Sequence, residues 1–251
     1  YAKISKKRGK LMKKLTIMIP CYNEEKGIAK VIKKIPTKKL QSLGYKTHVL
    51  VIDNNSKDNT SQVAKAAGAE VIFEKKQGKG YAVRTGIKHI SKDTDLVVML
   101  DGDNTYDPKE MPRMLEPLAA GFCDAVIGSR LAGKIAKNSM TSFNRAGNWI
   151  FTFLVRTMYH ENVTDVCTGY FAWKKPVLEK LSKHLEADGF SLEMEMITKM
   201  ARMNFAIYSV PISYTNRSGH TNLRPLVDGK KILHAWLRNL TWKPYAESKG
   251  G

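Results

Sequence analysis

The stretch that decides the fold is LVVMLDGDNTYDP, residues 96–108, in which an apolar run changes abruptly into acidic residues. Residues 96–100 are apolar at consecutive positions, which is typical of a strand covered on both faces in a parallel sheet. Ligands of such sheets bind at the carboxyl ends of the strands. Asp101 and Asp103 would crowd two negative charges, and a hard divalent cation would offset their repulsion. Taken alone, the same residues also fit a solvated turn.

Apolar runs and helical patterns alternate on both sides of this stretch. Expected strands are 15–19, 48–52, 69–73, 96–100 and 124–127, and expected helices are 24–35, a helix from Ser56 or Asp58 to 67, 79–90 and 108–120. This alternation indicates βαβ units and an α/β fold with a mainly parallel central sheet. Beyond it we expect helices at 143–159, 176–184, 192–203 and 228–242, and strands at 166–173 and 205–213. The predicted organisation is a basic N-terminal arm (1–14), one catalytic domain (15–227) and a C-terminal amphipathic helix with a tail (228–251).

The chain of 251 residues is strongly basic, because 42 lysines and arginines outnumber 23 acidic residues and give a net charge of +19. This balance points to an anionic partner, which could be a nucleic acid, a phosphorylated substrate or a membrane surface. The three cysteines form no Cys-x-x-Cys pair, which favours a reducing compartment and argues against structural zinc. No apolar stretch reaches the roughly 20 residues that a membrane-spanning helix needs.

Polar residues follow four of the expected strands, at 20–24 (PCYNE), 53–56 (DNNS), 101–103 (DGD) and 128–130 (GSR). In a parallel sheet these four segments meet at one edge and form a crevice for a ligand. A nucleoside diphosphate would use each of them. Carboxylate and amide groups suit the base and ribose, a metal ion suits the diphosphate, and an arginine suits the remaining negative charge.

At this point the motifs resemble those of a known family. The ordered set Pro20-x-Tyr22-Asn23-Glu24, Asp53-x-x-Ser56-x-Asp58-x-Thr60, Gly78-Lys79-Gly80, Asp101-x-Asp103 and Gly128-Ser129-Arg130 resembles glycosyltransferase family 2, whose fold is GT-A. The second half is similar to dolichyl-phosphate sugar synthases in Asp165-x-x-Thr168-Gly169-Tyr170, Glu193-Met194-Glu195-Met196, Val210-Pro211-Ile212-Ser213-Tyr214 and Arg217-x-Gly219.

The resemblance implies a role for each matching position. The nucleobase and ribose of the donor would be held by Pro20, Tyr22, Glu24 and Asp53. Asp103 would ligate Mg²⁺ or Mn²⁺, and Asp101 would contact the nucleotide or hold metal-bound water. Phosphates of acceptor and donor would be bound by Arg130, Arg145 and Arg217. Some mannosyl members have Gln where this chain has Thr105, so UDP-glucose, UDP-GlcNAc and GDP-mannose stay open as donors, with a slight preference for a UDP-sugar.

The chemistry of the acceptor agrees with this hypothesis. A phosphomonoester, whose second pKa is near 6, is mostly dianionic at neutral pH, so its attack on a sugar needs no general base. We therefore predict a metal-dependent inverting transferase that uses dolichyl or polyprenyl phosphate, with catalytic roles for Asp103, Arg130 and Arg217. A family 2 enzyme that glycosylates a sugar or protein hydroxyl is the alternative, and Glu195 is its candidate base. A basic nucleic-acid-binding protein is a remote third, because no recognisable binding signature is present.

Two helices bear on membrane association. The aromatic pattern of the helix 143–159 fits either a core helix or an interfacial helix beside the active site. The helix 228–242 is apolar on one side and basic on the others, with Lys230, Lys231, Arg238 and Lys243 suited to anionic head groups. Together with the basic arm, these features predict peripheral association with the cytoplasmic face of a membrane, with or without a separate membrane subunit.

Overall fold

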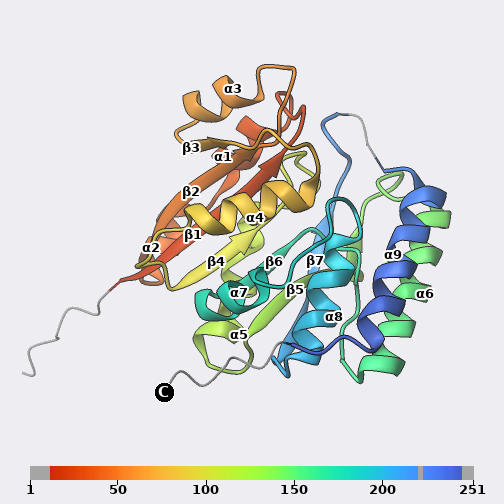
Figure 1. The fold of residues 1–251 in the computed structure, drawn as a ribbon. Helices are drawn as coiled ribbons and strands as arrows, with labels where there is room; N and C mark the ends of the chain where they lie inside the picture. The colour runs from red at the N-terminus through yellow and green to blue at the C-terminus, as the bar shows by residue number, and fades with distance from the viewer. Residues whose placement is uncertain (1–11, 220–222, 245–251) are drawn as a thin grey trace, which may run out of the picture.

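The computed structural model describes residues 12–219 and 223–244, and the predicted basic arm lies outside them apart from its last three residues. Its centre is a seven-stranded sheet of order β3-β2-β1-β4-β6-β5-β7 (Figure 1). The strands are β1 (Lys13–Cys21), β2 (Tyr45–Asp53), β3 (Glu70–Phe73), β4 (Leu96–Met99), β5 (Ala125–Ile135), β6 (Phe171–Lys174) and β7 (Ile207–Tyr214). Only β6 runs against its neighbours β4 and β5 in this described sheet. The prediction of an α/β fold with a mainly parallel sheet is therefore confirmed.

Helices cover both faces of the sheet (Figure 1). On one face lie α1 (Ile28–Lys34), α2 (Thr37–Ser42), α3 (Thr60–Ala66) and α5 (Met111–Ala119), the last preceded by the short 3₁₀ helix η1 (Pro108–Glu110). On the other lie α4 (Lys79–His89), α6 (Ser142–Tyr159), α7 (Lys175–Ser182), α8 (Leu192–Arg202) and α9 (Pro225–Leu240). The chain thus forms three layers with the sheet in the middle.

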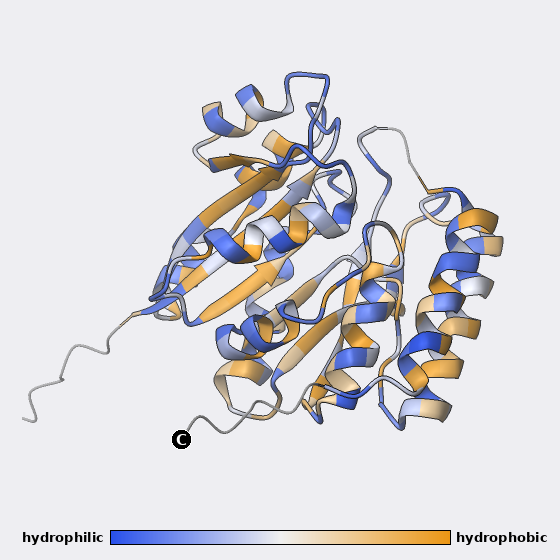
Figure 2. Cartoon of the chain, in the orientation of Figure 1, coloured by the Kyte–Doolittle hydropathy of each residue, from blue (hydrophilic) through white to orange (hydrophobic). Residues whose placement is uncertain are grey.

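The core consists of two apolar clusters, one on each side of the sheet. In β1, Met18 joins the cluster under α4, whereas Ile17 and Ile19 join the cluster under α1 and α5. β4 is buried along its whole length, as its uninterrupted apolar sequence predicts. Figure 2 shows the same pattern, with hydrophobic residues along the strands and hydrophilic ones in the loops. Burying each large apolar side chain contributes roughly 1.5–3 kcal/mol, so the two clusters hold the sheet in place.

Three expectations about elements after residue 120 were wrong. The strand expected at 166–173 is confined to 171–174, because Asp165 accepts a hydrogen bond from the backbone N–H of Arg130 and Thr168 accepts one from the backbone N–H of Tyr170. β5 continues to Ile135, so Arg130 lies within a strand rather than in a loop after it. α9 begins at Pro225 rather than at 228, and Ile232, Ala235 and Trp236 join the core.

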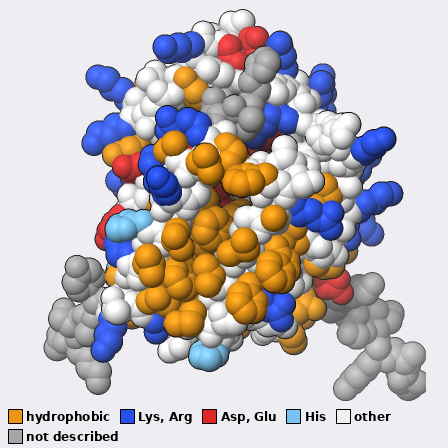
Figure 3. Space-filling view, turned by 90° about the vertical axis from the view of Figure 1, so that its right-hand side faces the viewer, with side chains coloured by type: hydrophobic (Ala, Val, Ile, Leu, Met, Phe, Trp, Pro, Cys, Tyr) orange, Lys and Arg blue, Asp and Glu red, His pale blue; other side chains and the backbone are white. Residues whose placement is uncertain are grey.

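The face formed by α6 and α9 is apolar at its surface. These two helices pack side by side (Figure 1). α6 buries Thr152, Val155 and Tyr159 and packs the partly buried Phe151 and Leu154 against the core, while several of its other apolar residues are exposed. Figure 3 shows hydrophobic side chains gathered over this face, with lysines and arginines around them. We call these residues the apolar face: Phe143, Trp149, Ile150, Phe153, Met158, Leu226, Val227, Leu233 and Leu237, each at least 40% exposed. No helix in the described part of the chain is long and apolar enough to traverse a bilayer.

Candidate active site

The acidic turn after β4 lies against the first turn of α4. Lys79 begins that helix, and its Nζ lies 2.7 Å from Asp101 Oδ1 and 2.6 Å from Glu193 Oε1. Burial alone would lower the pKa of Lys79, but the two carboxylates raise it instead, so the ammonium stays charged. The flanking glycine is required by close packing, because a Cβ on Gly80 would lie 1.7 Å from the carbonyl oxygen of Ala187. Lys79 is thus held between two acids by a tightly packed backbone.

A second cation, Arg217, pairs with two further acids near Asp101. Arg217 places one guanidinium nitrogen 2.6 Å from Asp103 Oδ2 and the other 3.2 Å from Glu24 Oε1. Asp103 Oδ1 accepts hydrogen bonds from the backbone N–H and hydroxyl of Thr105, at 2.9 and 2.6 Å. Burial, with Asp103 next in effect, raises the pKa of Glu24 to about 8. Burial and the charge of Asp101 likewise raise the pKa of Asp103. Burial and mutual repulsion therefore disfavour the charged forms of these two acids.

Two cavities adjoin at this cluster. The first, of about 410 Å³, is lined by Pro20, Tyr22, Glu24, Asn54, Asp101 and Asp103 among others. The second, of about 670 Å³, is lined by polar residues that include Arg130, Asn148 and Glu193 and by the apolar residues Phe143, Phe151, Leu226, Ile232 and Leu233. Both are lined by Lys79, Asp101, Phe190 and Arg217. We call them the first and the second cavity, and a ligand in one would meet a ligand in the other at these four residues.

The structure brings most of the predicted site residues together. Pro20, Tyr22, Glu24, Asp101, Asp103 and Arg217 all line the first cavity. Asp53 does not, because its buried carboxylate accepts hydrogen bonds from the backbone N–H of Ser56, at 2.9 Å, and from the hydroxyl of Ser61. Arg145 is exposed on α6 and lines neither cavity. The first cavity therefore gathers Glu24, Asp101 and Asp103, whereas Asp53 and Arg145 line neither cavity.

Arg130 lines the second cavity and forms an ion pair with Asp165. Its Nε and one terminal nitrogen lie 2.7 and 2.8 Å from the two carboxylate oxygens of Asp165, which is fully buried. Asn148 of α6 donates a further hydrogen bond to Asp165, at 2.7 Å. Such a bidentate pair fixes both side chains, so Arg130 also ties β5 to the loop before β6.

Sequence reasoning missed the roles of Lys79 and Glu193. The signal for Lys79 was present, since glycines on both sides of a lysine indicate close approach of the backbone to another group. Glu193 stands in one of the motifs that carry the resemblance, but the sequence gave it no role of its own, because an acid in the first turn of a helix is favoured anyway. Its burial depends on how α8 packs against α4.

The acidic cluster around Asp101 and Asp103 suits a divalent cation whose remaining ligands come from a bound substrate. The described residues contain no group of three or more His, Cys, Asp or Glu that forms a protein-only metal site. The acids Glu24, Asp101, Asp103 and Glu193 nevertheless set four carboxylates against the two cations Lys79 and Arg217. Mg²⁺ is often bound through one or two carboxylates together with substrate phosphates, and the pair Asp101 and Asp103 suits that arrangement.

The parallel sheet, the paired aspartates at its edge and the adjoining cavities define a glycosyltransferase of the GT-A fold class. The chain belongs to glycosyl transferase family 2, whose family model matches residues 16–182. The predicted family and fold are therefore confirmed, and the protein is an enzyme of the glycosyltransferase type.

Similar proteins come from archaea and bacteria. Glycosyltransferase AglJ of Haloferax volcanii is 37% identical over 220 residues, which are 86% of this chain and 69% of that protein. A dolichyl-phosphate hexose transferase of the same organism is 30% identical over 87% of this chain and 90% of its own length. In fold, the chain is similar to glucosyl-3-phosphoglycerate synthase of Mycobacterium tuberculosis, crystallised with Mn²⁺, UDP and phosphoglyceric acid. That structure has a TM-score of 0.71 and 23% identity, and the similarity covers 91% of this chain and 79% of the other.

Proposed function

We propose that the enzyme transfers a sugar from a nucleotide donor, with a UDP-sugar favoured, to dolichyl phosphate or another polyprenyl phosphate at a membrane surface, with Mg²⁺ or Mn²⁺ as cofactor. One observation carries the proposal. The second cavity shares the charged residues Lys79, Asp101 and Arg217 with the first and is also lined by apolar side chains of α6 and α9. An acceptor with an anionic head and an apolar chain matches this combination, and a polar sugar acceptor does not.

The first cavity is suited to the donor. Pro20 and Tyr22 offer an apolar and an aromatic surface for a base, and Glu24 lies beside them for a ribose hydroxyl. Asp101 and Asp103 would hold a divalent cation, which when bound supplies positive charge to the diphosphate of the donor. The name of the dolichyl-phosphate hexose transferase supports a lipid phosphate and a hexose, and the neighbouring fold was crystallised with Mn²⁺ and UDP.

The shared wall of the two cavities is suited to the transfer. In the proposed reaction, an oxygen of the acceptor phosphate attacks the anomeric carbon while the bond from that carbon to the donor diphosphate breaks. Two anions must approach each other for this step, and Lys79 and Arg217 lie at the wall where they would meet. A phosphate nucleophile needs no base.

The alternative acceptor, a sugar or protein hydroxyl, finds less support. It requires a base, for which the sequence offered Glu195. That carboxylate is fully buried and lines neither cavity. Its oxygens accept hydrogen bonds from two backbone N–H groups and lie next to Lys199 and Arg238. A base so enclosed has no path to a substrate in either cavity.

The apolar face supports docking on a membrane. It adjoins the second cavity, because Phe143, Leu226 and Leu233 belong to both. An interfacial helix pair buries such side chains among the acyl chains, and each nearby lysine adds about 1 kcal/mol at an anionic surface. Lys230 and Lys231 are exposed on α9 and suit that role. Arg238 does not, because it pairs with Glu186 and Glu195.

The test is transfer of radiolabelled sugar in the presence of Mn²⁺. UDP-glucose, UDP-GlcNAc and GDP-mannose are offered in turn with a short-chain polyprenyl phosphate, and the matching polyprenol serves as the acceptor control. We expect product with the phosphate, none with the alcohol, and loss of product in EDTA and in Asp103→Ala. The matched control is Asp93→Ala, since Asp93 is an exposed aspartate paired with Lys14. Product from the alcohol, or an active Asp103→Ala variant, would refute the proposal.

A further inference from the structure

One wall of the first cavity is built from the loop between α7 and α8, residues 183–191, which we call the α7–α8 loop. Gly189 and Phe190 of this loop line the first cavity. The backbone N–H of Gly80 donates to the carbonyl of Asp188 at 2.9 Å. From α4, Arg84 contacts the loop at the carbonyl of Ala187, at 2.8 Å, and at Asp188 Oδ1, at 2.9 Å. The position of the loop therefore affects both the cavity and the backbone around Lys79.

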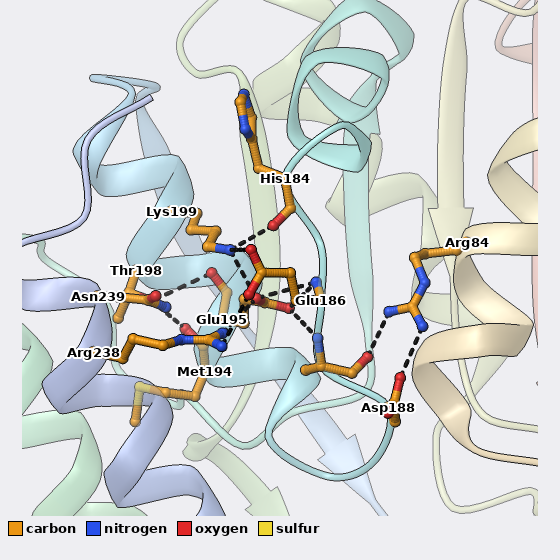
Figure 4. Close-up of polar contacts among 11 residues, drawn as sticks. Arg84, His184, Glu186, Asp188, Met194, Glu195, Thr198, Lys199, Arg238 and Asn239 are labelled. Atoms are coloured by element: carbon orange, nitrogen blue, oxygen red, sulfur yellow. Dashed lines mark hydrogen bonds and ion pairs between the residues drawn. The ribbon is translucent and has the colours of Figure 1, made fainter. Parts of the chain in front are cut away.

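Glu195 of α8 holds the loop from the opposite side (Figure 4). Its carboxylate accepts hydrogen bonds from the backbone N–H groups of Glu186, at 3.0 Å, and Ala187, at 2.8 Å. Two cations lie against the same carboxylate, Lys199 Nζ at 2.8 Å and Arg238 at 3.0 Å. Because Glu195 is fully buried, this carboxylate depends on all four partners for its charge to be tolerated.

The second of these cations ties the network to α9. Arg238 also lies 2.9 Å from Glu186 Oε2, so one guanidinium links the loop, α8 and α9. Next to it, the amide of Asn239 donates to the hydroxyl of Thr198 at 2.8 Å. The outward side of α9 carries Leu233 and Leu237 of the apolar face. The helix that bears part of this face is thus joined through buried polar groups to the wall of the first cavity.

We propose that Glu195 and Arg238 are positioning residues for nucleotide binding, and that they set the α7–α8 loop against α4 from the side of α9. The inference rests on the proposed function, because it takes the first cavity as the nucleotide site. Neither side chain lines that cavity, so both act through the backbone of Glu186 and Ala187. Displacing a supporting group by a fraction of an ångström loosens the geometry of a site without unfolding it.

The experiment measures binding of UDP and of GDP, each with Mn²⁺, by titration calorimetry on the full chain. The variants are Glu195→Gln, Arg238→Gln and the conservative Arg238→Lys, and the control is Arg156→Gln, an exposed arginine on α6. We expect Kd to rise about tenfold in the two glutamine variants, since small misplacements of supporting groups cost affinity on this order. Arg238→Lys should recover most of the affinity, and the control should match the wild type.

Kinetics and melting separate positioning from mere stability. With the donor that the transfer assay identifies, the donor KM should rise about tenfold in Arg238→Gln while the acceptor KM stays within twofold. The double variant should be no worse than either single one, because both changes release the same loop. A lower Tm with unchanged Kd and donor KM at 20 °C would overturn the inference.

The failure of the inference is distinct from that of the proposed function. If the wild type binds neither nucleotide, both fall together. If the wild type binds UDP or GDP and both glutamine variants bind with unchanged Kd, the inference alone is wrong.

Discussion

The sharpest test of the acidic turn is a single methyl group at Gly169. A Cβ built there would lie 2.3 Å from Asp101 Oδ2 and 2.8 Å from Asp101 Cγ. Ordinary contact begins at 3.4 Å, so the carboxylate would have to retreat by roughly 1 Å. Gly169 does not have a positive φ, so the cost is steric and falls on Asp101 rather than on the backbone. The same movement would disturb the 2.7 Å contact of Asp101 with Lys79.

We expect Gly169→Ala to lower the rate of transfer on the order of 100-fold, because a misplacement of about 1 Å has that effect at a catalytic group. This corresponds to about 2.7 kcal/mol of transition-state stabilisation. The assays are transfer kinetics and calorimetric binding of UDP with Mn²⁺. Gly147→Ala is the control for binding, because a Cβ there meets nothing within 4 Å and Gly147 does not line the first cavity. Wild-type rates in Gly169→Ala would refute the assignment of Asp101.

Three further outcomes follow from the same geometry. The raised pKa of Glu24, about 8 against an ordinary 4.5, means that folding favours the protonated acid, so the stability it contributes at low pH is lost as the pH rises towards 8. The metal-free Glu24→Gln variant should therefore have a Tm close to that of the wild type at pH 5 and about 2–4 °C higher at pH 8.5. This shift corresponds to a gain of about 1 kcal/mol in the free energy of unfolding after solvent screening. A Tm difference between variant and wild type that is the same at both pH values would contradict the burial of the Glu24 carboxylate. Asp165→Asn removes the partner of buried Arg130, costs about 3–5 kcal/mol and should lower Tm by roughly 10 °C by circular dichroism; a loss under 2 °C would show that the pair contributes little. Phe153→Ser on the apolar face should weaken sedimentation with anionic vesicles at least threefold without lowering Tm, and equal binding would exclude this face as the docking surface.

The first half of the fold could be predicted from sequence because its signals are local. β4 is an uninterrupted apolar run, β1 is mostly apolar after its two lysines, and both strands lead into a polar turn, a combination that has few other structural solutions. The second half was predicted less well. Residues 165–170 have the composition of a strand, yet Asp165 is drawn to Arg130 and Thr168 bonds to the backbone of Tyr170, so tertiary contacts override the local preference.

The candidate site shows the same contrast between residues with local sequence signals and residues placed by tertiary contacts. The position of Asp101 and Asp103 at the sheet edge could be predicted from sequence because a buried apolar strand ends directly before them, although these residues taken alone also fit a solvated turn. Arg130 was expected as a phosphate-binding residue after a strand, and its pairing with Asp165 was not predicted, since that partner is 35 residues away in the chain. The burial of Glu193 and Glu195 depends on the packing of α8 against α4 and α9. Sequence periodicity does not predict which helix packs against a given acidic residue.

The ion pairs at Asp101 and Asp103 affect how the proposed site would bind the donor and its cation. Asp101 is paired with Lys79 and Asp103 with Arg217, so each acid already has a positive partner. Asp103 can ligate a cation through Oδ2 only after Arg217 moves away from it, and the released guanidinium then lies beside the phosphates that accompany that cation. Donor and cation are therefore expected to bind as a pair, because phosphate gives Arg217 a new partner that a cation alone does not provide. The same exchange leaves Lys79 between the two cavities, where the departing diphosphate and the incoming phosphate would both need positive charge.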